Sequence, residues 1–369
     1  MINVIGIFLF ILPPLLLVSP ALAAEKSREE QAVEQRQKVD ILSFFLKDPK
    51  TAEVPKTPMA AGLYNQAVEH FQRSDYELAR QALQDSISYD NKNPLAYELL
   101  GDVDYYEQKL SDAKGHYETA YGLQPSAGLQ KKIEKIRDES RVERNLSTYR
   151  EQHFIIKYKN SEQQFEGFEL RELLRETYRN ISQEFAYYFN HQVVVILYDE
   201  DDFRKITNAP HWAAGLYDGK VRMPVSRKGF GETDLRALTA HEVTHAFVAA
   251  MSGNQAPGWI NEGLAEYMEA KIKKSDQIIF KAALKTNRLI PADQLMLPSS
   301  ALGMNDTLQI GLFYQQSLEM VSFMVKRYGM FRVKQVLAEY GKGSNSDEAL
   351  RNVLHISPVR LESEWKSSL

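Results

Sequence analysis

Two histidines and three glutamates, placed in two short stretches, are the residues of this chain whose types and spacing could do chemistry. The stretches read Ala240-His241-Glu242-Val243-Thr244-His245 and Asn261-Glu262-Gly263-Leu264-Ala265-Glu266. Residues four apart share a face of an α-helix, so His241 and His245 can point both imidazoles at one zinc ion, with Glu242 beside the open coordination position. A catalytic zinc ion (Zn2+) needs a third protein ligand besides water, and we assign it to Glu262. The predicted chemistry is hydrolysis.

Glu266 lies on the same helical face as Glu262, because it follows that residue by four positions. A carboxylate there can accept the ring N–H of a ligating histidine, which fixes the tautomer of the ring and raises its basicity. We therefore assign Glu262 to the metal and Glu266 to the histidine N–H. The reverse assignment stays open, because the spacing defines the face of the helix and not how deep each carboxylate lies in the site.

Two helices must position these side chains. The first is predicted from about Asp234 to Met251, with Thr233 as its N-cap and Gly253 as its C-cap. The second begins after Pro257-Gly258 and is predicted from Trp259 to about Ile272. Further helices are expected beyond them, at 313–328 closed by Gly329, at 331–340 closed by Gly341, and from Ser357-Pro358 onward.

A region of mixed strands and helices precedes the first of these helices. Strands are predicted at Phe154–Tyr158 and Val193–Tyr198, with an amphipathic helix between them over residues 168–189. The extended piece Gly215–Pro224 ends in a proline, which a central strand does not tolerate, so we expect it at a sheet edge. An edge strand beside a metal-binding helix is a place where an extended peptide can add itself to the sheet. The fold class expected for residues 149–369 is therefore α+β, with a small mixed sheet, a zinc helix and a helical C-terminal lobe.

Residues 58–148 contain a repeat with a period of 34 residues. Five positions of the first copy recur in the second: Leu63, Ala67, Ala79, Leu83 and Ser86 return as Tyr97, Gly101, Ala113, Tyr117 and Ala120. Small residues let two helices approach and large ones fill the space between them. This pattern resembles the tetratricopeptide repeat, an all-α module, with Leu129–Thr148 as a capping helix. Such a module is either a rigid spacer or a groove for a peptide or protein partner.

The first 57 residues indicate export. Residues 1–23 form an apolar run that ends in Ala21-Leu22-Ala23, which is typical of a signal peptide, although no Lys or Arg precedes Lys26. Residues 24–57 are predicted to be a charged linker. We expect a periplasmic or secreted protein, with membrane contact only if the first segment stays uncleaved.

Composition excludes several classes of site and partner. The formal net charge of −4 and the pI near 6.1 give no basic surface for nucleic acid, so we expect no nucleic-acid partner. The chain contains no cysteine, so disulfides and thiolate ligands are excluded and any metal must be held by His, Asp or Glu.

The metal-site stretches resemble those of the gluzincin metallopeptidases, in which a His-Glu-x-x-His helix is completed by a glutamate from a following helix. The second stretch, from Trp259 to Tyr267, is similar to the third-ligand segment of that clan, and residues 149–369 are similar to the peptidase-MA-like domain often joined to tetratricopeptide repeats. The resemblance implies a zinc-dependent peptidase that holds its substrate in a cleft. No Gly-Ala-Met-Glu-Asn segment precedes the zinc helix, only Ala214-Gly215-Leu216-Tyr217-Asp218, so we expect an endopeptidase rather than an aminopeptidase.

The resemblance also implies roles for individual residues. Zinc activates a water molecule and polarises the scissile carbonyl, while Glu242 takes the proton of the water and delivers it to the leaving amine. Related enzymes stabilise the oxyanion with a tyrosine or histidine. Our first choice for that donor is Tyr314, with Tyr217 and His211 behind it.

Two alternatives to a peptidase stay open. The chain could be a non-catalytic repeat scaffold that carries a relic zinc domain, or a zinc hydrolase of non-peptide bonds. The presence of His241, Glu242, His245 and Glu262 together argues against a relic, which would be expected to have lost one of them.

Overall fold

The computed structural model describes residues 57–159, 167–189, 191–207, 214–224, 231–297 and 307–369. The predicted signal peptide (residues 1–23), all but the last residue of the predicted linker, and the donor candidate His211 lie outside these residues. Within the described residues, no helix combines the length and the apolar character needed to cross a membrane.

Helices follow one another from residue 58 to residue 143, and polar caps and prolines define where several of them begin. The Thr57 side chain accepts the N–H of Ala60, and Asn93 and Ser126 cap two later helices in the same way. The helices are α2 (Pro58–Gln72), α3 (Tyr76–Tyr89), α4 (Pro94–Tyr106), α5 (Leu110–Leu123) and α6 (Ala127–Glu143).

Most of the repeated small and large positions of these helices are buried as the 34-residue pattern requires, whereas Leu63 and Tyr97 are half-buried. Ala67, Ala79 and Ala113 are inaccessible to solvent. Gly101 is needed for close packing, since a Cβ there would lie 2.4 Å from the ring of Tyr117. The assignment of these helices to tetratricopeptide repeats stays a prediction.

The segment predicted as a capping helix ends earlier than expected. Helix α6 stops at Glu143, and Ser147–Arg150 forms strand β1, which pairs antiparallel with β2 (Phe154–Tyr158). The prediction of a helix to Thr148 was therefore wrong at its C-terminal end. Strand β1 is mostly exposed and lacks apolar alternation, so the pairing with β2, rather than any local pattern, defines it.

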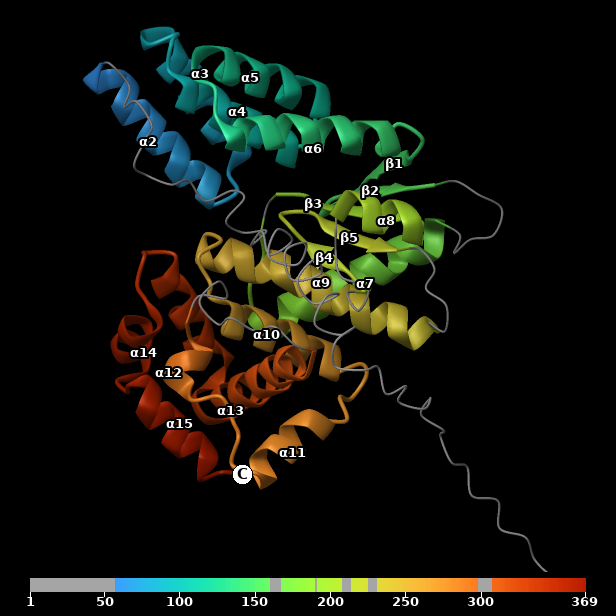
Figure 1. Cartoon of the computed structure of the whole chain (residues 1–369), viewed down its shortest axis with the longest axis vertical. Helices are drawn as coiled ribbons and strands as arrows, with labels where there is room; N and C mark the ends of the chain where they lie inside the picture. Colours follow the sequence, from blue (N-terminus) through green and yellow to red (C-terminus); the bar gives the residue numbers. More distant parts are fainter. Residues whose placement is uncertain (1–56, 160–166, 190, 208–213, 225–230, 298–306) are drawn as a thin grey trace, which may run out of the picture. The chain divides into compact units, whose positions relative to one another are not determined.

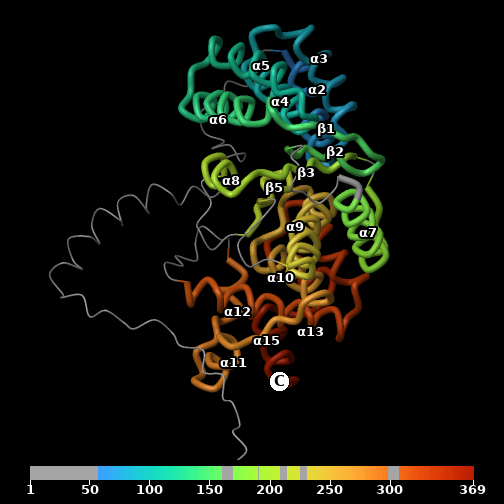
Figure 2. The backbone as a smooth tube through the Cα atoms, turned by 90° about the vertical axis from the view of Figure 1, so that its right-hand side faces the viewer, coloured from blue at the N-terminus to red at the C-terminus, as the bar shows by residue number. Residues whose placement is uncertain are grey.

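The mixed five-stranded sheet has the order β1-β2-β3-β5-β4. Strand β3 (Val193–Tyr198) is parallel to β2 and to β5 (Val221–Pro224), and β4 (Leu216–Tyr217) is antiparallel to β5. Figures 1 and 2 show the sheet between α2–α6 on one side and α9 on the other. Helices α7 (Gly167–Phe185) and α8 (Glu200–Thr207) alternate with the strands.

The extended piece Gly215–Pro224 is not a single edge strand, which corrects the expectation from its terminal proline. It reverses direction around Gly219, whose φ of +87° favours glycine, and forms the hairpin β4–β5. Strand β4 is the edge, whereas β5 lies between β3 and β4. Pro224 is tolerated because it is the last residue of β5 and lies opposite Tyr198, the last residue of β3.

Helix α9 (Glu232–Ser252) carries both histidines and is buried along most of its length. The predicted N-cap Thr233 is wrong, because Gly231 takes that position and its backbone N–H donates to Asp234 Oδ2 at 2.9 Å. The expected C-cap is confirmed, since Gly253 adopts a left-handed conformation with φ of 56°.

The described part of the chain after α9 is helical. Its elements are α10 (Gly258–Ala270), α11 (Ile278–Lys285), α12 (Ala292–Leu295), α13 (Thr307–Tyr340), α14 (Ser346–Leu354) and α15 (Pro358–Lys366). The predicted break at Gly329 is present as an interruption of α13, where φ is 80° and ψ is 153°. Ser357 caps α15 as predicted. One apolar core joins the sheet with α7, α9, α10 and α13.

Candidate metal centre

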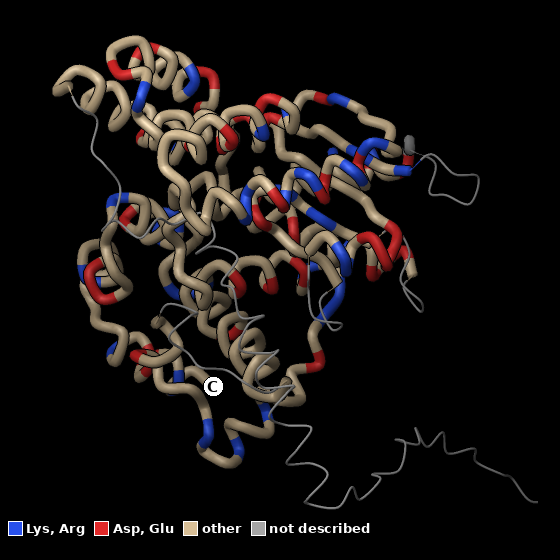
Figure 3. The backbone as a smooth tube through the Cα atoms, turned by 45° about the horizontal axis from the view of Figure 1, so that its top comes forward, with Lys and Arg blue, Asp and Glu red and all other residues tan. Residues whose placement is uncertain are grey.

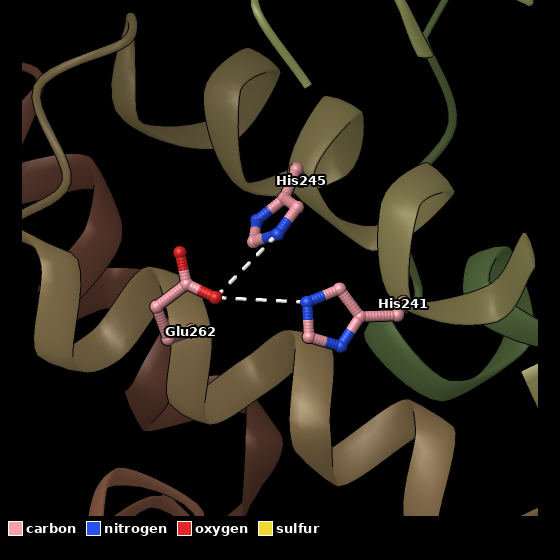
Figure 4. A group of neighbouring side chains, drawn as sticks. All are labelled: His241, His245 and Glu262. Atoms are coloured by element: carbon pink, nitrogen blue, oxygen red, sulfur yellow. Dashed lines mark ion pairs between the residues drawn. The ribbon is translucent and has the colours of Figure 1, made fainter. Parts of the chain in front are cut away.

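Helices α9 and α10 bring His241, His245 and Glu262 together. The two histidines lie one turn apart on α9, with ring centroids separated by 5.0 Å. Glu262 extends from α10, and its Oε2 lies 3.6 Å from His241 Nε2 and 3.7 Å from His245 Nε2, as Figure 4 shows. Each residue offers one ligand atom, and the three atoms lie within 4.8 Å of one another.

This arrangement fits a tetrahedral metal ion. Two ligands of a zinc ion held at about 2.0–2.1 Å are about 3.4 Å apart, close to the two distances from Glu262 Oε2. Among the described residues, that buried oxygen has no hydrogen-bond partner. An unsatisfied buried carboxylate oxygen costs free energy, and a cation between it and the two imidazoles would remove that cost. The residues present therefore fit zinc.

The other ring nitrogen of each histidine faces a hydrogen-bond acceptor. His241 Nδ1 lies 2.9 Å from Glu269 Oε2, and His245 Nδ1 lies 3.0 Å from Asn261 Oδ1. When each Nδ1–H donates to its acceptor, the lone pair of each Nε2 faces Glu262. The two acceptors thus hold both rings in the orientation that a metal requires.

Glu269, and not Glu266, is within hydrogen-bond distance of His241. Glu266 Oε1 lies 4.0 Å from His241 Nδ1, whereas the contact of Glu269 is more than 1 Å shorter. Sequence reasoning missed both Glu269 and Asn261. Glu269 follows Glu262 by seven residues and therefore shares its helical face, which is the signal that could have identified it.

Glu242 lies in a cavity that His241 also lines, in an apolar and negatively charged environment. Burial raises the pKa of Glu242 to about 8, the Glu262 and Glu269 carboxylates add to this, and His241 opposes it. Among the described residues, its Oε2 has no hydrogen-bond partner. A carboxyl group whose pKa is near neutrality is suited to both accepting and donating a proton.

Gly215 allows the chain to pass directly over Glu242. A Cβ at Gly215 would lie 2.4 Å from Glu242 Oε1, so any larger residue would displace the carboxylate. The glycine stands immediately before β4, and sequence reasoning had assigned it no role. The residue directly before the edge strand therefore lies against the candidate proton carrier.

The pKa values of the two histidines are displaced in opposite directions. Burial acts to lower the pKa of His241, but Glu262 and Glu269 raise it well above 6.5. Burial lowers the pKa of His245, and Glu262 opposes that shift only in part. Burial acts to raise the pKa of Glu262, but the two histidines keep it below its ordinary value. Glu262 therefore remains ionised beside the imidazoles, as a metal ligand must.

Tyr314 lines the same cavity, which has a volume of about 440 Å³, together with His241, Glu242, Glu266 and Glu269. Burial raises the pKa of Tyr314 well above 10, and the nearby carboxylates of Glu262, Glu242 and Glu266 add to this. The hydroxyl consequently keeps its proton and can donate a hydrogen bond.

Tyr217 approaches the site from strand β4. Its ring stacks on that of His245, with centroids 6.2 Å apart. The structure thus places two of the three sequence-predicted donor candidates, Tyr314 and Tyr217, beside the histidines.

Close packing of α10 on α13 brings Tyr314 into place. A Cβ at Gly263 would lie 2.6 Å from the backbone oxygen of Ser317 and 2.5 Å from Val321 Cγ2. Ser317 is almost one helical turn beyond Tyr314 on α13. The glycine directly after Glu262 therefore permits the close approach of α13, the helix that carries Tyr314, to α10.

The C-terminal part of the chain is similar to a known family. Residues 230–369 match the Peptidase MA superfamily, and this range includes both histidines and every glutamate of the site. The sheet, with Gly215 and Tyr217, precedes the matched residues. No curated protein and no solved structure matches the chain. The match favours a metallopeptidase-like domain.

Proposed function

We propose that this chain is an exported zinc-dependent metallopeptidase of the gluzincin type. The observation that carries the proposal is the convergence of His241, His245 and the unsatisfied Glu262 oxygen beside Glu242, within the residues that match the Peptidase MA superfamily. His241, His245 and Glu262 would hold the zinc ion. Zinc supplies Lewis acidity, which lowers the pKa of water and polarises carbonyl groups.

Glu242 is the proton carrier of the proposed reaction. It lines the same cavity as His241, so a carboxylate here can take a proton from the attacking water and give that proton to the departing amine. A Cβ at position 215 would lie 2.4 Å from Glu242 Oε1, so glycine at this position leaves the carboxylate its space in the cavity that both residues line.

Tyr314 is the proposed donor to the oxygen that becomes negatively charged. Its hydroxyl is protonated at neutral pH, and it lines the cavity on the side of α13, opposite α9. A donor placed before the reaction begins stabilises developing charge without reorganisation.

Strand β4 is the proposed docking edge for a peptide substrate. It is the terminal strand of the described sheet, it is in contact with α9, and Tyr217 on it stacks against His245. A peptide that pairs with β4 would run past the metal ligands. This mode suits an internal peptide segment, which supports endopeptidase rather than aminopeptidase activity.

Cleavage of a peptide library by the wild type, beside Glu242→Gln, tests the proposal. Glu118→Gln on α5 is the control, because Glu118 is an exposed residue paired with Lys114. We expect chelator-sensitive cleavage in the wild type and the control. Glu242→Gln should keep its zinc and lose about 100-fold or more in kcat. Cleavage by Glu242→Gln at the wild-type rate would contradict the proposal, and a zinc-loaded wild type that cleaves no peptide would favour a different bond as the substrate.

A further inference from the structure

The turn of the β4–β5 hairpin is enclosed by residues of helices α4 and α6. Arg222 of β5 is fully buried, and its guanidinium contacts Asp218 Oδ1 at 2.9 Å on its own hairpin. It also contacts Glu139 Oε1 of α6 at 2.9 Å and the hydroxyl of Tyr105 of α4 at 2.7 Å. One arginine of the sheet therefore joins both helices.

The residues at the tip of the hairpin make further contacts with the same helices. Lys135 Nζ of α6 lies 2.7 Å from Asp218 Oδ2. The ammonium group of Lys220 lies 3.3 Å from the centre of the Tyr105 ring and 3.4 Å from Glu139 Oε2. The helices thus hold the charged residues on both sides of the turn.

Gly219, at the tip itself, rests against the ring of Tyr106. A Cβ at that position would lie 1.9 Å from Tyr106 Cε1, which leaves no space for any residue except glycine. Tyr105, Tyr106, Lys135 and Glu139 together form what we call the α4–α6 clamp.

The other end of the hairpin is at the metal centre. Gly215 is in contact with Glu242, and Tyr217 stacks on His245. Asp218 directly follows Tyr217 in the chain and is three residues beyond Gly215. A displacement of the turn by an ångström would therefore move the strand that borders Glu242 and His245.

The Arg222–Glu139 ion pair is deeply buried, and Lys132–Asp102 and Lys157–Glu143 are largely buried, whereas many charged pairs of the described helices are exposed. Figure 3 shows positive and negative positions interspersed along the described helices, and pairs such as Lys114–Glu118 are half exposed. Exposed pairs of this kind contribute little stability. The Arg222–Glu139 pair is only 1% exposed on each side. Buried charges are costly to desolvate, so their presence favours a role in defining geometry rather than in adding stability.

We propose that the α4–α6 clamp positions strand β4 beside the metal centre, so that binding of an extended peptide depends on helices of the N-terminal part of the chain. One part of this proposal, the consequence for substrate binding, rests on the peptidase function proposed above. Its structural part, that the clamp holds β4 in place, is independent of that function. The faces of α4 and α6 that form the clamp therefore contact the β4–β5 hairpin of the same chain.

The substitution Lys135→Met tests the clamp with limited risk to the fold. Lys135 is 21% exposed, and its loss leaves Asp218 paired with Arg222. The matched control is Lys131→Met, an exposed lysine one turn earlier on α6. Lys135→Arg keeps the charge and should behave as the wild type.

Hydrogen exchange of residues 215–220 in the full-length protein is the first measurement, made with and without zinc. We expect exchange about tenfold faster in Lys135→Met than in Lys131→Met, because one charged hydrogen bond that holds the turn is lost. Exchange in α10 should stay the same in both variants. Equal exchange at residues 215–220 in both variants would overturn the proposal.

Peptide hydrolysis is the second measurement, at a temperature at which both variants are fully folded. We expect KM to rise about tenfold in Lys135→Met, with kcat and zinc content close to those of the control. A residue with a purely structural role would lower the thermal midpoint without changing KM. Faster exchange with an unchanged KM would therefore overturn the positioning role. If the wild type hydrolyses no peptide, the function proposed above fails, and hydrogen exchange alone decides whether the clamp holds β4.

Discussion

Substitution of Glu269 by glutamine should weaken zinc binding more than the same substitution of Glu266. Both residues belong to α10, and their side chains are 32% and 19% exposed. The difference is in their contact with His241 Nδ1, which is 2.9 Å for Glu269 Oε2 and 4.0 Å for Glu266 Oε1. Only the shorter distance permits a hydrogen bond.

The expected magnitudes follow from these two distances. Loss of the carboxylate that orients a ligating histidine weakens metal binding by about 10- to 100-fold, which is about 1.4–2.8 kcal/mol. Glu266 lies too far from His241 Nδ1 for a hydrogen bond, so its effect on the orientation of that ring is through its charge. Burial, with help from Glu269 and Glu262, raises the pKa of Glu266 to about 7, so that charge is incomplete at neutral pH. We therefore expect Glu266→Gln to weaken binding by at most about fivefold.

Competition for zinc with a chromogenic chelator at pH 7.5 (about one unit above the ordinary histidine pKa) measures both affinities under identical conditions. The Glu266→Gln variant serves as the matched control, since it removes a carboxylate from the same helical face. A larger loss for Glu266→Gln than for Glu269→Gln would refute the inference that hydrogen-bond distance selects the orienting residue. Equal losses would show that charge, and not orientation, governs the affinity.

Three further predictions concern packing, pH and the proposed donor. Gly263→Ala should lower the free energy of unfolding by about 1–3 kcal/mol, because its Cβ would meet the backbone of Ser317; denaturant titration measures this. Glu139 has its pKa lowered to about 2 by Arg222, Lys220 and Lys135 although burial acts to raise it. Folding therefore favours the ionised form of Glu139, and this pH-dependent part of the stability is complete above the ordinary glutamate pKa of about 4.3 and is lost as the pH falls towards 2. Glu139→Gln should lose less stability over that pH range, as measured by denaturant titrations at several pH values. Tyr314→Phe should lower kcat about 100-fold with unchanged zinc content and little change in KM, as measured by steady-state peptide hydrolysis.

A different result in each of the three measurements would contradict the corresponding prediction. An unfolding free energy of Gly263→Ala equal to that of the wild type would mean that α10 and α13 separate without cost. An acid loss of stability that is the same with and without the Glu139 carboxylate would place the acid-sensitive group elsewhere. Full activity of Tyr314→Phe would remove Tyr314 as the donor and leave Tyr217 as the next candidate.

The part of the site that local periodicity controls could be predicted from the sequence. His241 and His245 share a face because they are four residues apart on a helix, and the structure brings Glu262 to them from the next helix. The buried strands β2 and β3 were likewise predicted, since continuous apolar runs of this length form buried strands.

The parts that depend on depth and on tertiary contacts could not be predicted. Spacing placed Glu266 on the correct face, but Glu269, one turn further along the same face, is the residue within hydrogen-bond distance of His241 Nδ1. Lys220 and Arg222 have the residue types of exposed positions, yet both are fully buried, because α4 and α6 supply their partners. No local pattern reports on partners that lie about 80 residues away in the chain.

The zinc content of the purified wild-type protein, measured beside that of Glu262→Ala, tests the central claim most directly. The account predicts about one zinc ion per wild-type chain, because three ligand atoms and two oriented imidazoles are already in place. It predicts a folded, zinc-free Glu262→Ala variant, which has lost one of the three ligands. A folded wild type that takes up no zinc, or a Glu262→Ala variant that retains it at full affinity, would contradict the account.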